Sequence, residues 1–105
     1  TSETVRQRRQ MAYEGMITLI VTVDAETGEV QGEPEIVARG VRGFDGANGS
    51  LKDARRVVAA SIAGASRQTL NDEELLKEHV RVELKRFIQK STGARPVIMP
   101  VVVQV

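Results

Sequence analysis

Apolar and polar positions alternate most clearly near the start of the chain. From residue 16 to 24, apolar side chains recur at every second position, which is the spacing of one face of a β-strand. These residues are Ile17, Leu19, Val21 and Val23. A turn at residues 25–28 and a partner strand at residues 29–40 follow, which predicts a hairpin. Because Pro34 donates no backbone hydrogen bond, we expect the second strand to lie at an edge of the sheet or to carry a bulge.

Helical spacing replaces this alternation in the second half of the chain. Apolar residues three or four positions apart predict one helix from residue 51 to about 68 and another from about 73 to 91. The predicted core stripe of the later helix is Leu76, Val80, Leu84, Phe87 and Ile88. A short helix at residues 2–13 is predicted before the first strand. Glycines make residues 41–50 a flexible loop.

The last nine residues form a further apolar strand. Only Gln104 is polar between residues 97 and 105, and so apolar a terminus is expected to belong to the sheet. By odd and even numbering, we expect four residues to face the helices: Val97, Met99, Val101 and Val103. Four even-numbered apolar residues then fall on the opposite face and form a candidate interface: Met16, Ile20, Ile98 and Val102. Either the first helix or another subunit is expected to cover them.

These elements predict an α+β fold of two layers. A three-stranded sheet in the order 2-1-3 packs on two helices, with β-β-α-α-β connectivity after the short N-terminal helix. If the two later helices form a hairpin, the last strand runs parallel to the first. The 105 residues suit one domain, which we assign to residues 16–105, and residues 1–15 form a connecting helix in a larger protein. A chain that starts at Thr1 without Met suggests an excised piece.

Composition narrows the class of protein. A net charge of +1 argues against strong non-specific binding to phosphate, and the absence of cysteine excludes disulfides and fits a cytoplasmic location. No apolar run reaches the length of a membrane helix, so we expect no membrane partner.

The sequence offers little catalytic chemistry. His79 is the one histidine, and zinc sites usually draw on several His or Cys residues, so we favour a structural role for it. The glycines of residues 40–46 lack the Lys-Ser/Thr of a phosphate-binding loop. We therefore assign no catalytic, cofactor-binding or metal-binding residue to this chain.

Basic side chains are the remaining candidates for a ligand contact. Between residues 39 and 56 there are five basic and two acidic side chains. The candidate RNA-contacting residues are Arg39, Arg42, Arg55, Arg56 and Arg95. A solvated helix face is the competing interpretation. The three aromatic residues lie outside the predicted strands, so any contact with RNA is expected to involve backbone phosphates and not base stacking.

Several segments, taken in order, resemble the C-terminal domain of ribonuclease J, a bacterial ribonuclease with a metallo-β-lactamase fold. They lie at residues 8–17, 21–28, 34–40, 75–87 and 92–105. The last resembles the closing motif Thr-x-Arg-Arg-Pro-x-Ile-Leu-Pro-Val-x-Met-Glu-Val of that family. This chain departs from the family pattern at three positions. Val41 stands where Phe is usual, Ala94 replaces the first Arg of the Arg-Arg pair, and Gln104 replaces an acidic residue.

The resemblance implies a parent enzyme that degrades and matures RNA by 5′→3′ exonucleolytic and endonucleolytic cleavage. It also implies zinc or manganese in a preceding catalytic domain, whose His/Asp-rich motifs are absent here, with residues 1–15 as the connection from that region. On this reading the chain is a non-catalytic accessory domain. Its partners are the rest of the polypeptide and other copies in a homo-oligomer. The alternatives are an RNA-backbone-contacting module of the same enzyme and an independent enzyme.

Overall fold

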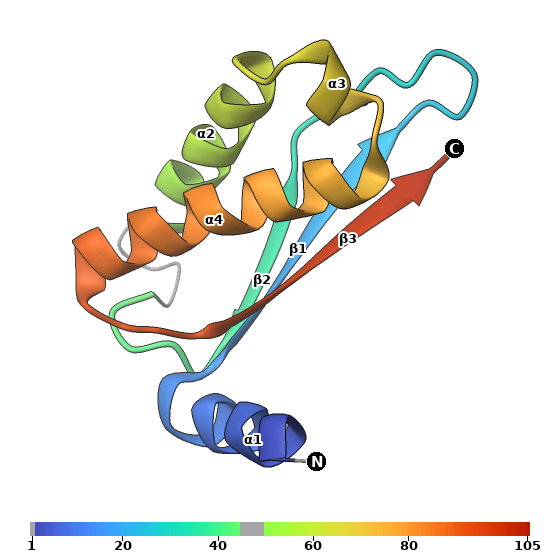
Figure 1. The fold of residues 1–105 in the computed structure, drawn as a ribbon. Helices are drawn as coiled ribbons and strands as arrows, with labels where there is room; N and C mark the ends of the chain where they lie inside the picture. The colour runs from blue at the N-terminus through green and yellow to red at the C-terminus, as the bar shows by residue number, and fades with distance from the viewer. Residues whose placement is uncertain (1, 45–49) are drawn as a thin grey trace.

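The computed structural model describes residues 2–44 and 50–105, and in this part the chain forms helices and strands in an α-β-β-α-α-α-β order. The elements are α1 (Ser2–Glu14), β1 (Met16–Val23), β2 (Glu35–Arg39), α2 (Ser50–Ala63), α3 (Arg67–Leu70), α4 (Glu73–Thr92) and β3 (Val97–Gln104). Helices α2 and α4 cross one face of the sheet, and α1 lies at the end where β1 begins (Figure 1). The predicted α+β fold is confirmed.

The sheet has the predicted strand order, with β1 in the centre. β2 pairs with β1 in the antiparallel direction, and β3 pairs with it in the parallel direction. Backbone bonds extend the β1–β3 pairing to the last residue, because Val105 N donates to Val23 O at 2.9 Å. The C-terminal strand is thus an integral part of the sheet, as its apolar sequence predicts.

The core lies between the sheet and the two long helices. Side chains of β1 alternate between partly and fully buried, and Ile17 and Leu19 are completely inaccessible to solvent. The predicted stripe of α4 is confirmed, since four of its members are buried and Phe87 packs partly buried against the core. The buried members of the two helices are Ala54, Val58, Ile62, Leu76, Val80, Leu84 and Ile88.

Two predicted elements are shorter in the structure. The helix expected to reach residue 68 ends at Ala63, because Ser66 starts the separate helix α3 by accepting a hydrogen bond from Thr69 N at 3.2 Å. The second strand is confined to Glu35–Arg39. Gly32 has a φ of +68°, which breaks the extended conformation before Pro34.

The loop predicted at residues 41–50 is described only in part. Val41 and Phe44 are buried members of the core, so its first residues are anchored to the protein interior. Residues 45–49 lie outside the described residues. Just before this loop, the Gly40 backbone approaches Gly15 so closely that a Cβ atom on Gly15 would lie 2.5 Å from Gly40 O.

The predicted facing of β3 is wrong. Ile17 of the buried β1 face pairs with Ile98, and Val21 pairs with Val102, so these two β3 residues face the helices. The prediction carried odd and even numbering from one strand to another, but the register between strands decides which residues share a face. The four odd-numbered residues Val97, Met99, Val101 and Val103 therefore lie on the side away from the helices. The last three of these side chains are exposed, whereas Val97 is buried.

Candidate functional site

The side of the sheet opposite the helices carries most of the exposed strand side chains, and we call it the open sheet face. Strand pairing assigns eleven residues to it. They are Glu35, Val37 and Arg39 of β2, Met16, Thr18, Ile20 and Thr22 of β1, and Val97, Met99, Val101 and Val103 of β3. Of the predicted interface residues, Met16 and Ile20 belong to this face, whereas Ile98 and Val102 do not.

The open sheet face exposes apolar side chains from both outer strands. Val37 is 47% exposed, and three of the β3 residues keep 40–44% of their surface accessible. Val37, Thr18 and Met99 lie side by side in one row across the three strands. A contiguous group of exposed valine and methionine side chains is unusual on a protein surface and is typical of a contact with another polypeptide.

Helix α1 leaves most of this face accessible. Gln10 Nε2 donates to Arg95 O at 2.6 Å, and Arg95 N donates to Glu14 Oε2 at 3.4 Å, so the helix is attached to the segment just before β3. Val97, the first residue of β3, is 7% exposed, but the exposed residues begin only two positions later. α1 itself exposes Val5 and Tyr13 and makes few contacts with the domain.

The free edge of β3 is poorly suited to adding another strand. Val97 N bonds to Gly15 O and Val105 N bonds to Val23 O, so the odd-numbered residues of β3 direct their backbone groups toward β1. The even-numbered residues then direct theirs to the free edge, where Pro100 has no N–H to donate. Proline on an edge strand discourages pairing with another strand. The face is therefore a better contact surface than this edge.

The predicted RNA-contacting arginines fall into two groups. Arg39 is level with Met16 at the start of β1, and Arg95 lies two residues before Val97, which pairs with the same Met16. Arg42 adjoins Gly43, which lies close to Thr92 at the end of α4. These three arginines thus share one end of the domain.

Arg55 and Arg56 form the second group, on α2. Together with Lys52, Glu33 and Ala59 they line a shallow groove of about 320 Å³. Arg56 Nη1 lies 3.8 Å from Asp53 Oδ1, in a pair whose side chains are both more than half exposed. Such a pair holds the arginine weakly, so its charge stays available to a ligand.

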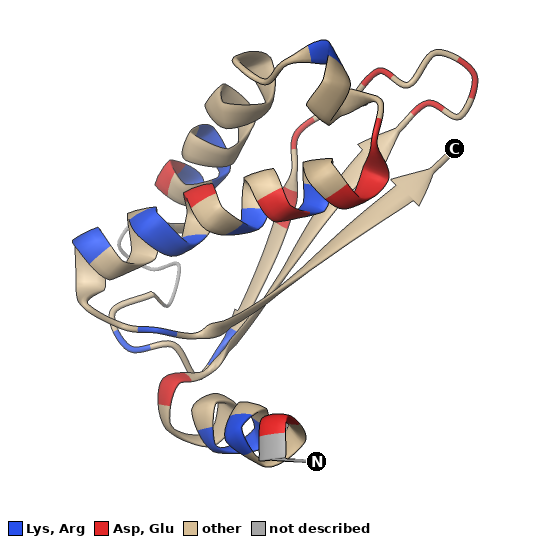
Figure 2. Ribbon diagram, viewed as in Figure 1, with Lys and Arg blue, Asp and Glu red and all other residues tan. Residues whose placement is uncertain are grey.

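Charge is distributed unequally along the molecule. Figure 2 shows acidic residues on the hairpin turn after β1 and at the start of α4, and basic residues along the end where β1 begins and where α4 ends. The acidic group includes Asp24, Glu26, Glu73 and Glu74. The small net charge therefore conceals a separation of charge between the two ends.

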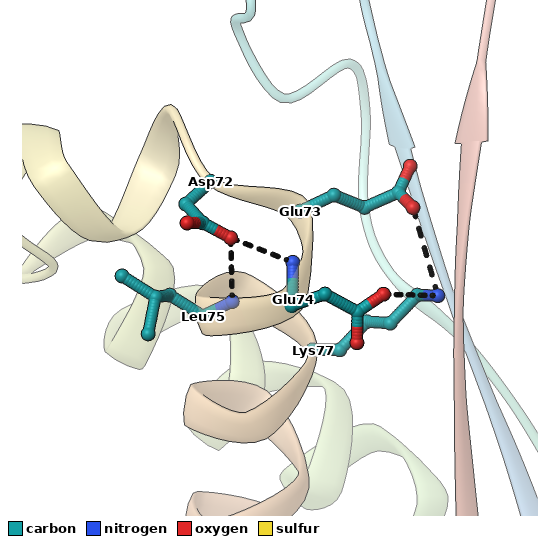
Figure 3. Close-up of polar contacts among 5 residues, drawn as sticks. All are labelled: Asp72, Glu73, Glu74, Leu75 and Lys77. Atoms are coloured by element: carbon teal, nitrogen blue, oxygen red, sulfur yellow. Dashed lines mark hydrogen bonds and ion pairs between the residues drawn. The ribbon is translucent and has the colours of Figure 1, made fainter.

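The carboxylates at the start of α4 have structural partners. Asp72 Oδ1 accepts hydrogen bonds from Glu74 N at 3.0 Å and Leu75 N at 3.2 Å, as in a helix N-cap (Figure 3). Lys77 Nζ lies 3.6 Å from a Glu73 oxygen and 3.4 Å from a Glu74 oxygen. Acidic side chains at the start of a helix are favoured by its dipole, so these carboxylates have a structural role.

Asp24 and Glu78 have lowered pKa values with local causes. Backbone N–H groups of Thr27 and Glu26 donate to Asp24 in the hairpin turn and lower the pKa of its carboxyl group. The Arg81 guanidinium, which bonds to Glu78 at 2.6 and 2.9 Å, lowers the pKa of Glu78. Both interactions stabilise the charged form of an exposed carboxylate, and neither carboxylate is paired with a second group suited to acid–base catalysis.

His79 connects the two long helices. Its Nε2 lies 2.9 Å from the carbonyl oxygen of Ser61, so the ring donates a hydrogen bond from α4 to α2. In the described part of the chain, no three His, Cys, Asp or Glu side chains lie close enough together to hold a metal ion. Among the helices of residues 2–44 and 50–105, none has the length and apolar character that a membrane span requires.

Sequence reasoning missed the exposed residues of β2 and β3. Val37 was overlooked because no facing was assigned to the residues of the second strand, and Met99, Val101 and Val103 were expected to face the helices. Pro100 was the available signal for the facing of β3. Because proline has no N–H to donate, its backbone is expected to point to the free edge, so the odd-numbered residues of β3 point their backbone groups toward β1.

Comparison with known proteins gives a consistent result along the chain. A family model described as the ribonuclease J C-terminal domain matches residues 3–105. The chain is 25% identical over 101 residues to ribonuclease J2 of Bacillus subtilis (strain 168). It is also 24% identical to ribonuclease J 2 of Staphylococcus aureus (strain NCTC 8325 / PS 47) and 25% identical to that of Staphylococcus epidermidis, again over 101 residues. Each alignment covers 96% of this chain but only 18% of the relative.

Proposed function

Because this chain belongs to the ribonuclease J C-terminal domain family, we propose that it is the non-catalytic accessory domain of a ribonuclease J-like enzyme. The parent would degrade and mature RNA by 5′→3′ exonucleolytic and endonucleolytic cleavage in the cytoplasm. The domain would support this activity by helping the subunits to assemble. The observation that carries the assembly role is the apolar open sheet face, which stays exposed after both long helices and α1 have packed.

The chemistry would reside in another part of the parent enzyme. In the described residues, no three possible metal ligands lie together, and two candidate groups have structural partners, Asp72 in the α4 cap and His79 in the bond to Ser61. We place the zinc or manganese of the parent in its catalytic domain. The chain alone, incubated with RNA and either metal, is expected to show no hydrolysis. Measurable turnover by this chain would favour the independent-enzyme alternative.

Removal of the domain from the parent tests the proposed role. Parent enzyme with and without this domain is compared by sedimentation velocity and by RNA hydrolysis under the same conditions. We expect the truncated enzyme to sediment as smaller species and to cleave RNA more slowly, because its subunits lose a contact that positions them. Unchanged assembly together with an unchanged rate would refute the accessory role.

A second candidate function is contact with the RNA backbone. Two observations favour it, namely the arginines Arg39, Arg42 and Arg95 at one end of the domain and the Arg55–Arg56 groove on α2. Basic side chains of this kind contact phosphates without reading the bases. With a net charge of only +1, the contact is expected to be weak and confined to these sites.

Salt dependence distinguishes this second function from the first. Binding of single-stranded RNA to the chain is measured by fluorescence anisotropy at several salt concentrations. If about three phosphates are contacted, the slope of log K against log salt is about −2 for a single strand. Arg39→Gln and Arg42→Gln are expected to reduce this slope, whereas Arg67→Gln on α3 serves as the control. The absence of binding at low salt would exclude the RNA-contacting function.

A further inference from the structure

Helix α1 presents an exposed basic face with an aromatic ring on it. We propose that this face binds a segment of single-stranded RNA, with phosphates on its arginines and one base stacked on Tyr13. The inference rests on the second candidate function, contact with the RNA backbone, and adds to it a further site and a contact with a base. Its basis is the orientation of α1 on the domain, together with the unpaired charges of this face.

One side of α1 attaches the helix to the domain. Glu3, Gln7 and Gln10 line a hollow of about 450 Å³ whose other walls are α4 and the start of β3. Gln10 Nε2 and Glu14 Oε2 also bond to the backbone of Arg95. The attached residues are spaced three or four positions apart, so they form one stripe along the helix. The opposite side of α1 therefore points away from the domain.

The side that points away carries all the basic residues of the helix, and every side chain on it is exposed. Around the helix axis, which has about 3.6 residues per turn, its members follow the order Arg8, Ala12, Val5, Arg9, Tyr13 and Arg6. Tyr13 is 86% exposed and is the only tyrosine of the chain. We call this side the basic face of α1. It combines positive charge with an aromatic ring and includes no acidic residue.

The arginines of the basic face have no acidic partner. In the described residues, none of Arg6, Arg8 and Arg9 forms an ion pair, whereas the ion pairs that do form lie on α2 and α4. Arg6 and Arg9 are three positions apart, where like charges repel each other and destabilise a helix. A local conflict of this kind is typical of a functional surface. A polyanion bound to the face would remove the repulsion.

The basic face adjoins the arginines at the same end of the domain. Gly15, the residue after α1, is so close to β2 that its Cβ would lie 2.7 Å from Arg39 O, and Gln10 contacts Arg95. Figure 2 shows basic residues on α1 and at the end of the sheet beside it. A strand of RNA bound along α1 can therefore continue to Arg39 and Arg95.

Tyr13 adds a contact that arginines alone do not provide. Stacking on an aromatic ring tolerates any base, because every base has a π-face. An exposed ring on a helix can stack as well as one on a strand, so the lack of aromatic residues in the sheet does not exclude stacking. Arg6 and Tyr13 are about 10 Å apart along the helix axis, which leaves room for about three stacked nucleotides.

A protein surface is the competing occupant of this face. Such a surface would have to supply several carboxylates at matching positions, whereas a nucleic-acid strand carries a phosphate at every nucleotide. The unpaired arginines therefore favour RNA.

Tyrosine fluorescence provides a specific test, because the chain has one tyrosine and no tryptophan. Oligouridylate of about ten nucleotides is titrated into the 105-residue chain at low salt, with correction for absorption by the RNA, and the anisotropy of a labelled strand verifies saturation. We expect the Tyr13 emission to fall by about half or more, because a stacked base quenches the ring. Inorganic polyphosphate, which has charges but no bases, is expected to bind without quenching. Unchanged emission at saturation with oligouridylate would overturn the proposal.

Substitutions on α1 separate the two kinds of contact. Tyr13→Leu is expected to weaken binding about tenfold, whereas Tyr13→Phe keeps the ring and should bind within about twofold of the wild type. The double variant with Arg6→Gln and Arg9→Gln should reduce the slope of log K against log salt by about 1.4, because each lost phosphate contact removes about 0.7. Arg67→Gln on α3 is the matched control, and far-UV circular dichroism verifies that every variant folds.

The outcomes distinguish this site from the function on which it rests. If binding responds to Arg39→Gln and Arg42→Gln but not to the α1 variants, the site on α1 is wrong and the RNA-contacting function stands. If the chain binds no RNA at low salt, both are wrong. Weaker binding by Tyr13→Leu and the double arginine variant, with Tyr13→Phe close to the wild type, would support the proposal.

Discussion

The clearest consequence of the strand register is a large difference between two adjacent residues of β3. Ile98 faces the helices and is 9% exposed, whereas Met99 lies on the open sheet face and is 44% exposed. Ile98→Ala removes buried methyl groups and leaves a cavity between the sheet and the helices, so we expect a loss of about 2–3 kcal/mol in the free energy of unfolding. For Met99→Ala we expect less than about 1 kcal/mol, because solvent already reaches the side chain.

Urea unfolding followed by circular dichroism at 222 nm measures both values. The signal suits this chain because helices dominate it, and its single tyrosine, Tyr13, is 86% exposed on α1 and would report poorly on the core. Thermal unfolding gives an independent estimate, since about 1 kcal/mol shifts the Tm of a domain of this size by about 4–8 °C. We therefore expect Ile98→Ala to lower the Tm by about 10–20 °C. Low-micromolar protein keeps self-association out of the measurement.

The opposite ranking would refute the register. If Met99→Ala cost as much as Ile98→Ala, the odd-numbered residues of β3 would have to face the helices after all. Both variants should retain the wild-type denaturant slope, because neither changes how much surface unfolding exposes.

Three further predictions concern the local structure. Asp24→Asn keeps an acceptor in the hairpin turn but removes a carboxyl group whose pKa in the folded state lies below its unfolded value of about 3.9. In acid titrations, the variant should therefore lose less stability than the wild type between pH 5 and 3, and equal losses would exclude this contribution. Asp72→Ala removes the α4 cap and should cost about 1 kcal/mol in urea unfolding, and a neutral effect would count against the cap. Gly15→Ala should lower the free energy of unfolding by more than about 3 kcal/mol, because the added Cβ would meet Gly40 O. Gly93→Ala, whose Cβ would have nothing within 4 Å, should lower it by about 1–2 kcal/mol. Similar losses for the two variants would contradict the close approach of Gly15 and Gly40.

Much of the fold follows from local patterns in the sequence. The alternation in β1 and the helical stripe of α4 each identify a buried face without reference to any other element, and the structure confirms both. Pro34 correctly predicts an outer strand, since β2 lies at an edge. Capping also follows local rules, because Asp72 and Gly93, residue types typical of helix ends, bound α4.

Relations between elements were harder to predict. The sequence alone does not reveal that Ile98 pairs with Ile17, and a shift of one residue moves every β3 side chain to the other face. The candidate site depended on this register, so Ile98 and Val102 were misplaced while Met16 and Ile20 were placed correctly. The early end of α2 was missed because the capping hydroxyl of Ser66 competed with an otherwise continuous helical pattern.

The departures from the ribonuclease J pattern gain meaning from the structure. Ala94, which stands in place of an arginine, is completely buried, so this position contributes to the core and not to a basic surface. Val41 is also buried, whereas Gln104 lies exposed at the end of β3. The first two changes therefore affect packing, and the third affects only the surface.

We propose that the open sheet face holds subunits of a ribonuclease J-like enzyme together. The most direct test is the mass of the parent enzyme carrying Val101→Lys, measured by sedimentation equilibrium beside the wild type. Val101 is 40% exposed on this face, so the substitution should leave the domain folded while placing a charge in the contact. We predict a shift toward smaller assemblies at every concentration. An unchanged mass distribution, with the domain still folded, would contradict a role of this face in assembly.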